Sequence, residues 1–422
     1  MKILYVSQYF PPEMGAPAAR VSELSRHWVR AGHDVTVLTG FPNHPTGKLA
    51  AGYRKHFRRL VLTEEIDGVK VVRTWLLPLP NRKPYERMLN YTSFCISAAF
   101  TGLFLSRPDV VIASSPQLLV GLSGWWLARL KRASFVFEVR DLWPESLAAV
   151  GVGSSTSVLH RTLARIANLL YRRADRIAVV SPAFKDYLVK RLNVAAGKIF
   201  VVQNGVETDL FDSGRPQPNL RSKLGLEGKF VVSYIGTIGI AHGLEKVLDA
   251  AAELQYTHPQ IAFLFVGEGS DKERIISIAA SRKLINVRFV DEQPRERIPE
   301  YICASDTCLV LLKKSEIFKT VIPTKMLEFM SCARPVILGV DGQARKIIEE
   351  AHAGIFVQPE NVGDLTGAVV RLASDPELGN SLGRNGRQHI LQHFSRAQTA
   401  RTYIQMLEAL LENETFPTSV AA

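Results

Sequence analysis

Residues 318–337 read FKTVIPTKMLEFMSCARPVI, and this stretch says most about the fold and the chemistry of the chain. A polar loop leads into a short helix, and we expect a buried strand at 335–338. The start of a helix carries free backbone N–H groups and the positive end of the helix dipole, so it stabilises an anion. Lys325 adds a charge in the first turn, and Glu328 lies on the same helix face. This combination predicts a site for a sugar nucleotide, although a capped helix with both side chains in water is the alternative.

Alternating strands and helices on both sides of this stretch indicate the fold class. At 422 residues, the chain is too long for one ordinary core, so two domains are expected. Alternation of this kind predicts parallel sheets covered by helices on both faces, which is an α/β architecture with doubly wound domains. The break falls near residues 202–207. The expected strands lie at 3–6, 35–38, 69–74, 109–113, 135–139, 176–180, 230–235 and 262–266, and near Val287, Leu309, Val336 and Ile355.

The first stretch resembles the retaining glycosyltransferases of family 4, whose fold is called GT-B. Their signature has one Glu, seven further residues and a second Glu; Glu328 matches the second, but Thr320 stands at the first. Many members that build bacterial cell-surface polysaccharide instead carry Pro-x-Lys-x-x-Glu, which Pro323, Lys325 and Glu328 match. The resemblance extends from residue 5 to the last helix.

The resemblance implies that the two halves of the chain form domains with different roles. Residues 1–205 would form an acceptor-side Rossmann-like domain, and residues 206–395 a Rossmann-like domain that binds the nucleotide sugar. The two domains would face a central cleft, and residues 396–422 would return as a helix to the first domain.

A glycine-rich turn, YIGTIGIAHG at 234–243, opens the second domain between a strand and a helix. Glycine lets the backbone approach phosphate closely. The family often carries Arg after the first Gly and Lys before the last, whereas this chain has Thr237 and His242 there. Lys313 and Lys325 are therefore expected to supply the missing charge, although Lys313 could equally be a surface lysine. The donor-binding residues that we predict are Gly15, Gly236, Thr237, Gly239, Lys313, Thr320 and Glu328, with Lys325 as a catalytic residue.

The run FEVRDLWPE at 137–145 follows a buried strand in the first domain. Family members that this chain most resembles carry such an Asp-aromatic-Pro-Glu run at the donor sugar or acceptor. Asp141 is predicted as a catalytic residue, and Arg140 and Glu145 as acceptor-side residues. The alternative is a surface pair of Arg140 and Asp141, with Trp143 as packing.

Charge is distributed unevenly along the chain, which indicates a membrane partner. The chain carries a net charge of +12; residues 1–205 are strongly basic and residues 206–422 slightly acidic. A basic half, with clusters such as residues 54–59, suits an anionic surface. No nucleic-acid-binding module is visible, so lipid is favoured. Residues 88–106 lack charge but contain several polar side chains, which indicates an internal helix that partly enters the lipid interface. No signal peptide is expected, and the four cysteines lack metal-ligand spacing, so the protein is expected at the cytoplasmic face of the membrane.

The resemblance implies a metal-independent transfer of a sugar from a UDP-sugar to a lipid-linked saccharide, with retained anomeric configuration. No cofactor is expected besides the UDP-sugar co-substrate. Two alternatives stay open: a UDP-sugar 2-epimerase, and a non-catalytic subunit that binds a nucleotide sugar in an assembly complex.

Overall fold

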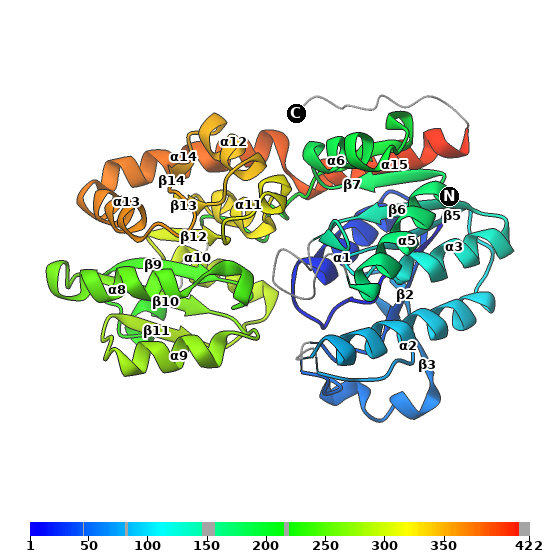
Figure 1. Ribbon diagram of the computed structural model, residues 1–422, viewed down its shortest axis with the longest axis horizontal. Helices are drawn as coiled ribbons and strands as arrows, with labels where there is room; N and C mark the ends of the chain where they lie inside the picture. Colours follow the sequence, from blue (N-terminus) through cyan, green and yellow to red (C-terminus); the bar gives the residue numbers. More distant parts are fainter. Residues whose placement is uncertain (45, 81–82, 146–156, 215–218, 413–422) are drawn as a thin grey trace. The chain divides into compact units, whose positions relative to one another are not determined.

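The computed structural model describes residues 1–44, 46–80, 83–145, 157–214 and 219–412. The chain forms two compact units (Figure 1). The first unit comprises Met1–Asn204 together with the chain from Arg396 onward, and the second comprises Gly205–Ser395. Each unit is built on its own mainly parallel sheet, so the predicted α/β class is confirmed.

In the described part of the first unit, the strand order is β3-β4-β2-β1-β5-β6-β7-β8. Neighbouring strands pair in parallel except β3 and β4, which form an antiparallel hairpin. The hairpin turns through Asp67 and Gly68, both at positive φ, as a tight two-residue turn requires. The strands are β1 (Lys2–Val6), β2 (Asp34–Gly40), β3 (Val61–Ile66), β4 (Val69–Thr74), β5 (Val110–Ser114), β6 (Ser134–Val139), β7 (Arg176–Val179) and β8 (Ile199–Val201).

Our expectation of a purely parallel first sheet was wrong at β3. This edge strand alternates between exposed and half-buried residues and carries Glu64 and Glu65. It therefore lacks the continuous apolar run by which the other strands were recognised.

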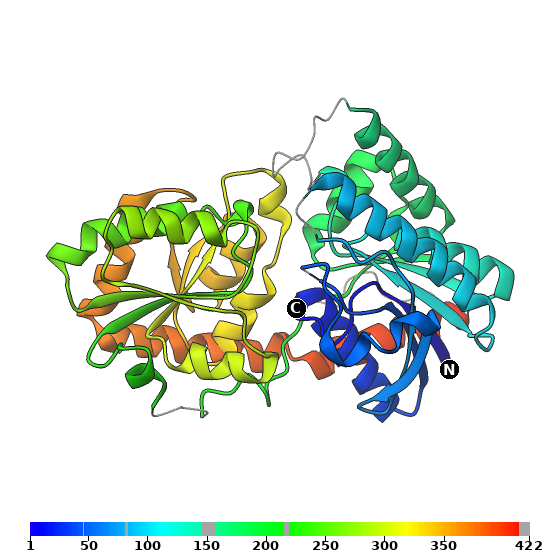
Figure 2. The same ribbon diagram turned by 90° about the horizontal axis from the view of Figure 1, so that it is seen from below.

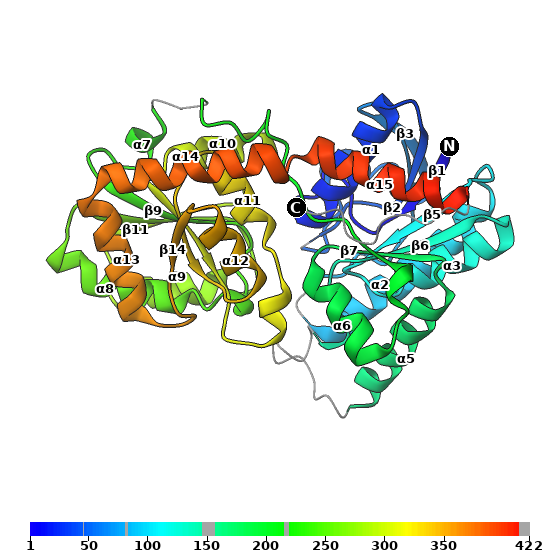
Figure 3. The ribbon, with the colours of Figure 1, turned by 90° about the horizontal axis from the view of Figure 1, so that it is seen from above.

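Helices cover both faces of the first sheet. On one face, α1 packs against α15 (Figure 3), and Trp28 Nε1 of α1 donates a hydrogen bond of 3.0 Å to the Ala400 carbonyl. On the other face, α3 comes so close that a Cβ on Gly124 would lie 2.6 Å from the Ala113 Cβ. The helices are α1 (Ala16–Arg30), α2 (Pro84–Leu103), α3 (Val120–Lys131), α5 (Val158–Arg173), α6 (Pro182–Leu192) and α15 (Arg396–Leu411), with short 3-10 helices η1 (Ala51–Tyr53), η2 (Phe57–Arg59) and η3 (Ala196–Lys198).

The uncharged stretch at 88–106 lies mostly within α2, which packs by one side against α3, β2 and β4, so the predicted helix is present. Among the described helices, none combines the length and the apolar character that a membrane span needs.

In the described part of the second unit, all strand pairs are parallel and the order is β11-β10-β9-β12-β13-β14. Successive connections run outward in opposite directions from β9 and β12, so these two strands flank a topological switch point. Ligands of open α/β sheets bind beyond the carboxyl ends of strands at such a point. The strands are β9 (Phe230–Ile235), β10 (Ile261–Val266), β11 (Val287–Val290), β12 (Thr307–Leu311), β13 (Val336–Gly339) and β14 (Gly354–Phe356).

Two apolar cores sandwich this sheet. The helices α8, α9 and α13 pack on one face, and α10, α11, α12 and α14 pack on the other. Every residue of α11 from Met326 to Ser331 is buried, so this short helix is fixed by the core beneath it. The helices are α7 (Leu220–Lys223), α8 (Glu245–Thr257), α9 (Lys272–Ser281), α10 (Ile298–Cys303), α11 (Thr324–Ser331), α12 (Gln343–Glu350), α13 (Val362–Ser374) and α14 (Pro376–His393), with η4 (Ile240–His242), η5 (Arg295–Arg297) and η6 (Ile317–Thr320).

Candidate active site

Two glycine loops lie backbone to backbone at the carboxyl ends of β9 and β10. Gly236 has φ of +132° and Gly267 has φ of +144°, a region that side chains rarely adopt. A Cβ on Gly267 would lie 2.1 Å from the Gly236 carbonyl oxygen, so no larger residue fits there. Ile238 N donates to the Glu268 carbonyl at 2.8 Å and fixes the two loops together. The predicted loop is thus held in one shape by its neighbour.

Lys325 places its amine against the first of these loops. Nζ would lie 2.9 Å from a Cβ on Gly236, and it donates a hydrogen bond of 2.9 Å to the hydroxyl of Tyr234. Nζ also lies 4.0 Å from the centre of the Tyr234 ring, where the π electrons attract a cation. Burial lowers the pKa of Lys325 to about 7, although Glu328 opposes that shift. The amine is therefore poised to gain a full charge when an anion arrives beside it.

Tyr234 and His242 hold this amine in place. The Tyr234 hydroxyl donates to the Thr237 carbonyl at 2.6 Å, while the exposed Thr237 side chain takes no part in that bond. Burial, and then the nearby Lys325 charge, lower the pKa of His242 to about 3. His242 is therefore neutral, and its Nδ1, 3.1 Å from the Leu311 carbonyl, carries the proton for that bond. A neutral imidazole here adds no second charge, in contrast to the Lys usual in the family.

Lys313 contacts the glycine loop, whereas the hydroxyl of Thr320 donates within its own short helix. The backbone N–H of Lys313 donates to the Ala241 carbonyl at 2.9 Å, which ties the end of β12 to η4. Its side chain passes Gly243, with Cγ 3.5 Å from where a Cβ would stand. Thr320 ends η6, and its hydroxyl donates to the Ile317 carbonyl at 2.6 Å. Gly239 forms the residue before η4. The structure thus brings Gly236, Gly239, Lys313 and Lys325 to one region of the second unit.

Glu328 has a partner that no sequence motif indicates. Its Oε1 lies 2.9 Å from Nη1 of Arg295, which belongs to η5. The Arg295 guanidinium in turn lies 4.9 Å from the ring centre of Phe211. Glu328 is buried, so this ion pair fixes the position of its carboxylate. Its predicted contact with a ribose stays a prediction.

The first unit has a buried charge cluster at the carboxyl end of its sheet. Glu138 accepts hydrogen bonds from Tyr5 Oη at 2.8 Å and Ser114 Oγ at 2.6 Å, and Arg20 Nη2 lies 2.9 Å from its Oε1. Burial by itself would raise the pKa of Glu138, but Arg20 and Arg140 hold it below its usual value. The ionised Glu138 carboxylate thus holds the side chains of Tyr5, Ser114 and Arg20 in place.

Arg140 connects this cluster to the start of α1. Its backbone N–H donates to Ser115 Oγ at 2.7 Å, and Nη2 donates to the Ala16 carbonyl at 3.0 Å. Nε and Nη1 are buried and have no hydrogen-bond partner among the described residues. Burial lowers its pKa to about 10, which leaves the side chain charged at neutral pH. Gly15, at φ of +113°, precedes α1, so a cation and free helix N–H groups meet at this point. Arg140 is thus bonded to Ser115 and to the start of α1, and Trp143 is buried, as the packing alternative expected.

Asp141 and Glu145 lie in different surroundings, although both belong to the segment after β6. Burial raises the pKa of Asp141 to about 6, against the effect of the Arg140 charge. Glu145 instead faces the phenols of Tyr171 and Tyr187; burial first, and then this carboxylate, raises the pKa of Tyr187 to about 12. The two predicted residues therefore have different neighbours: Asp141 lies near the Arg140 charge, and Glu145 lies near the two tyrosines.

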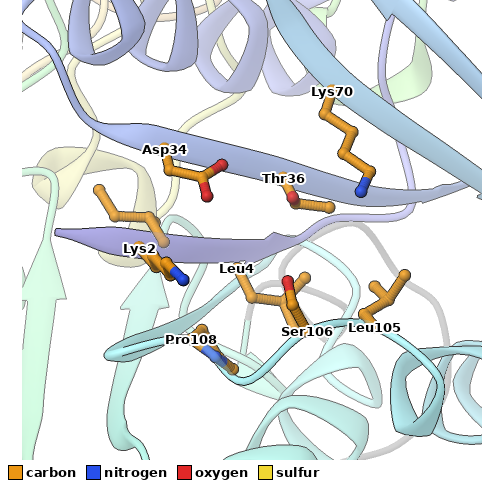
Figure 4. A pocket seen from close by; sticks show the side chains of 9 residues that line it. Lys2, Leu4, Asp34, Thr36, Lys70, Leu105, Ser106 and Pro108 are labelled. Atoms are coloured by element: carbon orange, nitrogen blue, oxygen red, sulfur yellow. The ribbon is translucent and has the colours of Figure 1, made fainter.

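A small pocket lies at the opposite edge of the first sheet, where its strands begin (Figure 4). Lys2, Asp34, Thr36 and Lys70 line it, and its volume of about 10 Å³ suits a single water. It lies away from the carboxyl ends of the strands, so it belongs to a different part of the unit from the charge cluster around Glu138.

Comparison with known proteins agrees with this geometry. Residues 15–205 match the family model of the glycosyl transferase 4-like domain, and residues 216–389 match that of glycosyl transferases group 1. The chain belongs to glycosyltransferase family 4. The two matched ranges fall one in each compact unit, and the protein is a glycosyltransferase, as its resemblance implied.

Three similar proteins place this family-4 chain among its relatives. The putative colanic acid biosynthesis glycosyl transferase WcaI of Escherichia coli (strain K12) is 26% identical over 385 residues, which are 87% of this chain and 91% of WcaI. Sucrose-phosphate synthase from Thermosynechococcus elongatus has a TM-score of 0.76 at 21% identity, covering 98% of this chain and 100% of that one. Anabaena HepE, solved in complex with UDP-glucose, has a TM-score of 0.72 at 17% identity, covering 97% and 100%. The predicted GT-B fold is confirmed.

Proposed function

We propose that this glycosyltransferase moves a sugar from a UDP-sugar to a lipid-linked saccharide, with retention of anomeric configuration, in the assembly of a cell-surface polysaccharide. The observation that carries the donor side is Lys325, whose amine lies against Gly236 at the switch point of the second sheet. The similar protein HepE binds UDP-glucose in its crystal structure, and WcaI is named for colanic acid biosynthesis. These two relatives support a UDP-sugar donor and a polysaccharide product.

In the proposed reaction, the bond between the anomeric carbon and the diphosphate breaks, and negative charge grows on the leaving oxygen. Lys325 stabilises that charge, because an anion at Gly236 restores the pKa that burial lowers. Tyr234 fixes the amine so that little reorganisation is needed at the moment of reaction. Gly239 and Lys313 border the same loop and complete the surroundings of the diphosphate.

Retention of configuration requires either attack on the same face or two successive inversions. We propose attack on the same face, in which the departing phosphate takes the proton of the acceptor hydroxyl. Asp141 is then a contact for a sugar or acceptor hydroxyl rather than a nucleophile. Incubation with a fluorinated UDP-sugar that slows the second step, followed by intact-protein mass spectrometry, tests this point. A covalent sugar on Asp141 or Glu145 would refute same-face attack.

The proposed acceptor is a saccharide on a polyprenyl diphosphate at the cytoplasmic face of a membrane. The basic character of residues 1–205 supports this proposal, because such a surface attracts anionic lipid headgroups and diphosphates. No metal or further cofactor enters the proposed mechanism.

The decisive experiment incubates the protein with UDP-hexoses and UDP-N-acetylhexosamines, with and without a polyprenyl-diphosphate saccharide, and reads the products by mass spectrometry. A lipid that gains one sugar mass supports the proposal and identifies the donor. An isomer of the nucleotide sugar formed without lipid would instead show an epimerase. UDP binding without any product would show a non-catalytic subunit.

A matched pair of variants separates the catalytic lysine from general charge effects. Lys325→Met keeps the length of the side chain but removes its amine, and it should abolish turnover. Lys314→Met removes an exposed lysine just after β12 and should leave turnover near the parent level. Equal activity of the two variants would contradict the role proposed for Lys325.

A further inference from the structure

An apolar stripe runs along the outer side of α2. The residues Leu89, Ile96, Phe100 and Phe104 follow one another at spacings of about two turns or one turn, and they are 50%, 66%, 64% and 78% exposed. Such spacing places their side chains on one face of a helix. Thr92 is the only exposed polar residue of α2 between Leu89 and Leu103. Apart from Thr92, which lies on the same face between Leu89 and Ile96, this stripe is an apolar surface along a helix of 20 residues.

The neighbouring helix widens the stripe. The helices α2 and α3 pack side by side on the outside of the first unit (Figures 1 and 2). On α3, Trp126 and Leu130 are also exposed. We name this surface, formed by Leu89, Ile96, Phe100, Phe104, Trp126 and Leu130, the α2–α3 face. Large contiguous apolar patches are rare on soluble monomers and usually mark a binding surface.

Basic groups border the α2–α3 face at one end. Arg107, Arg129 and Arg132 are exposed there. Lys131 Nζ donates to the Leu103 carbonyl at 3.0 Å, which places a cation at the end of α2. Apolar side chains on one surface, with cations at its border, are typical of helices that lie in the interface of an anionic bilayer. The same border opposes pairing with a second copy, because a two-fold interface would bring these like charges toward one another.

The inner side of α2 reaches the acceptor-side segment. Asn90 Nδ2 donates to Asn43 Oδ1 at 3.1 Å and to the Leu77 carbonyl at 2.8 Å. The Tyr91 ring lies 6.3 Å from that of Trp143, two residues after Asp141. One helix thus presents apolar residues outward and contacts the candidate acceptor side inward.

We propose that the α2–α3 face docks on an anionic lipid bilayer, with α2 lying in the plane of the interface. This inference rests on the proposed function for the identity of the acceptor, because docking here would bring lipid-linked saccharide close to the segment that contains Asp141. It names α2 and α3, rather than the basic cluster at 54–59, as the apolar contact with the membrane.

The test measures binding of the full chain to vesicles, without any sugar donor or acceptor. Vesicles of phosphatidylglycerol and phosphatidylethanolamine are compared with vesicles of phosphatidylcholine alone, by co-sedimentation. The variants Ile96→Gln and Phe104→Gln should each lower the partition coefficient about tenfold, since each removes a large apolar side chain from the interface. The control Tyr256→Gln removes a side chain that is 81% exposed on the second unit, and it should bind like the parent.

Two further measurements keep the outcome unambiguous. Brominated lipids should quench the fluorescence of Trp126, and Trp126→Phe should remove that part of the quenching. Melting temperature and UDP affinity show whether each variant is folded; for a variant that is not, Arg132→Gln supplies the alternative test and should weaken binding to anionic vesicles only.

Parent-like binding by Ile96→Gln and Phe104→Gln would overturn the proposal. So would a lipid-free dimer of the parent that these variants convert to a monomer, because a second copy would then cover the face. Vesicle binding that depends on the face, in a protein without transferase activity, would leave the docking intact and refute the proposed function instead.

Discussion

Replacing Lys325 by Met should stabilise the ligand-free protein while weakening its binding of UDP. Burial lowers the pKa of Lys325 from 10.5 to about 7, so the folded state disfavours the charged form. A displacement of that size corresponds to an upper limit of roughly 4–5 kcal/mol against the folded state at low pH. Because the side chain is partly exposed and bonds the Tyr234 hydroxyl, we expect about 2 kcal/mol to remain.

The sign of the pH dependence follows from the direction of this pKa shift. Between about pH 7 and 10.5, the unfolded chain binds a proton at Lys325 that the folded chain does not, so this group makes stability rise with pH. The advantage of Lys325→Met is therefore largest at pH 6 and disappears as the pH approaches 10. Thermal unfolding at pH 6 and pH 9 measures it, and we expect a gain of several degrees at pH 6 that falls to less than half of that size at pH 9.

Binding of UDP should depend on pH in the opposite sense. The diphosphate needs the ammonium form, which falls from about half of the molecules at pH 7 to about a tenth at pH 8. Affinity measured by calorimetry should therefore drop roughly fivefold over that unit in the parent, and the Met variant should lose this dependence. A Met variant that melts lower than the parent at pH 6, or that binds UDP as tightly at pH 7, would refute the reasoning.

Three further predictions concern other parts of the chain. Asp141→Asn should lower activity above pH 6 and leave the remainder without an acidic limb near pH 6, because burial raises the pKa of that carboxylate to about 6 and activity is expected to need its ionised form; a parent-like profile in steady-state assays would contradict this. Gly267→Ala should weaken UDP binding at least tenfold, because its Cβ would lie 2.1 Å from the Gly236 carbonyl oxygen. The control Gly367→Ala places its Cβ in open space on α13 and should raise the free energy of unfolding by roughly 0.5–1 kcal/mol. Charge reversal within residues 54–59 should release the protein from anionic vesicles at low salt, and unchanged co-sedimentation would show a merely solvated surface.

The alternation of apolar strands and helices was enough to predict most strands of both sheets and the position of α11. The glycine loop at Gly236 and the amine of Lys325 meet, as the family resemblance implied, since both follow strands that end at one switch point. The edge strand β3 was missed because its pattern is half polar. Elements were thus predicted where the spacing of apolar residues along the local sequence is regular, and missed where it is not.

Contacts between distant segments could not be read in the same way. Arg295 precedes its partner Glu328 by 33 residues, and nothing in either local sequence indicates the pair. Tyr234 lies on β9, and its hydroxyl bond to Lys325 depends on how α11 packs against the sheet. Glu145 stands four residues after Asp141 but faces Tyr187. Side-chain direction at the end of a strand is decided by tertiary packing, which the sequence pattern does not contain.

The pairing of α1 with α15 has a consequence for synthesis on the ribosome. The first unit takes its last helix from the end of the chain, and Tyr403 and Leu407 are fully buried in its core. Arg396 Nε also pairs with Glu23 Oε2 at 2.8 Å, inside that core. While the second unit is being translated, the face of α1 around Trp28 therefore has no cover. The half that is made first is completed last, and a premature stop late in the message would harm the beginning of the protein rather than its end.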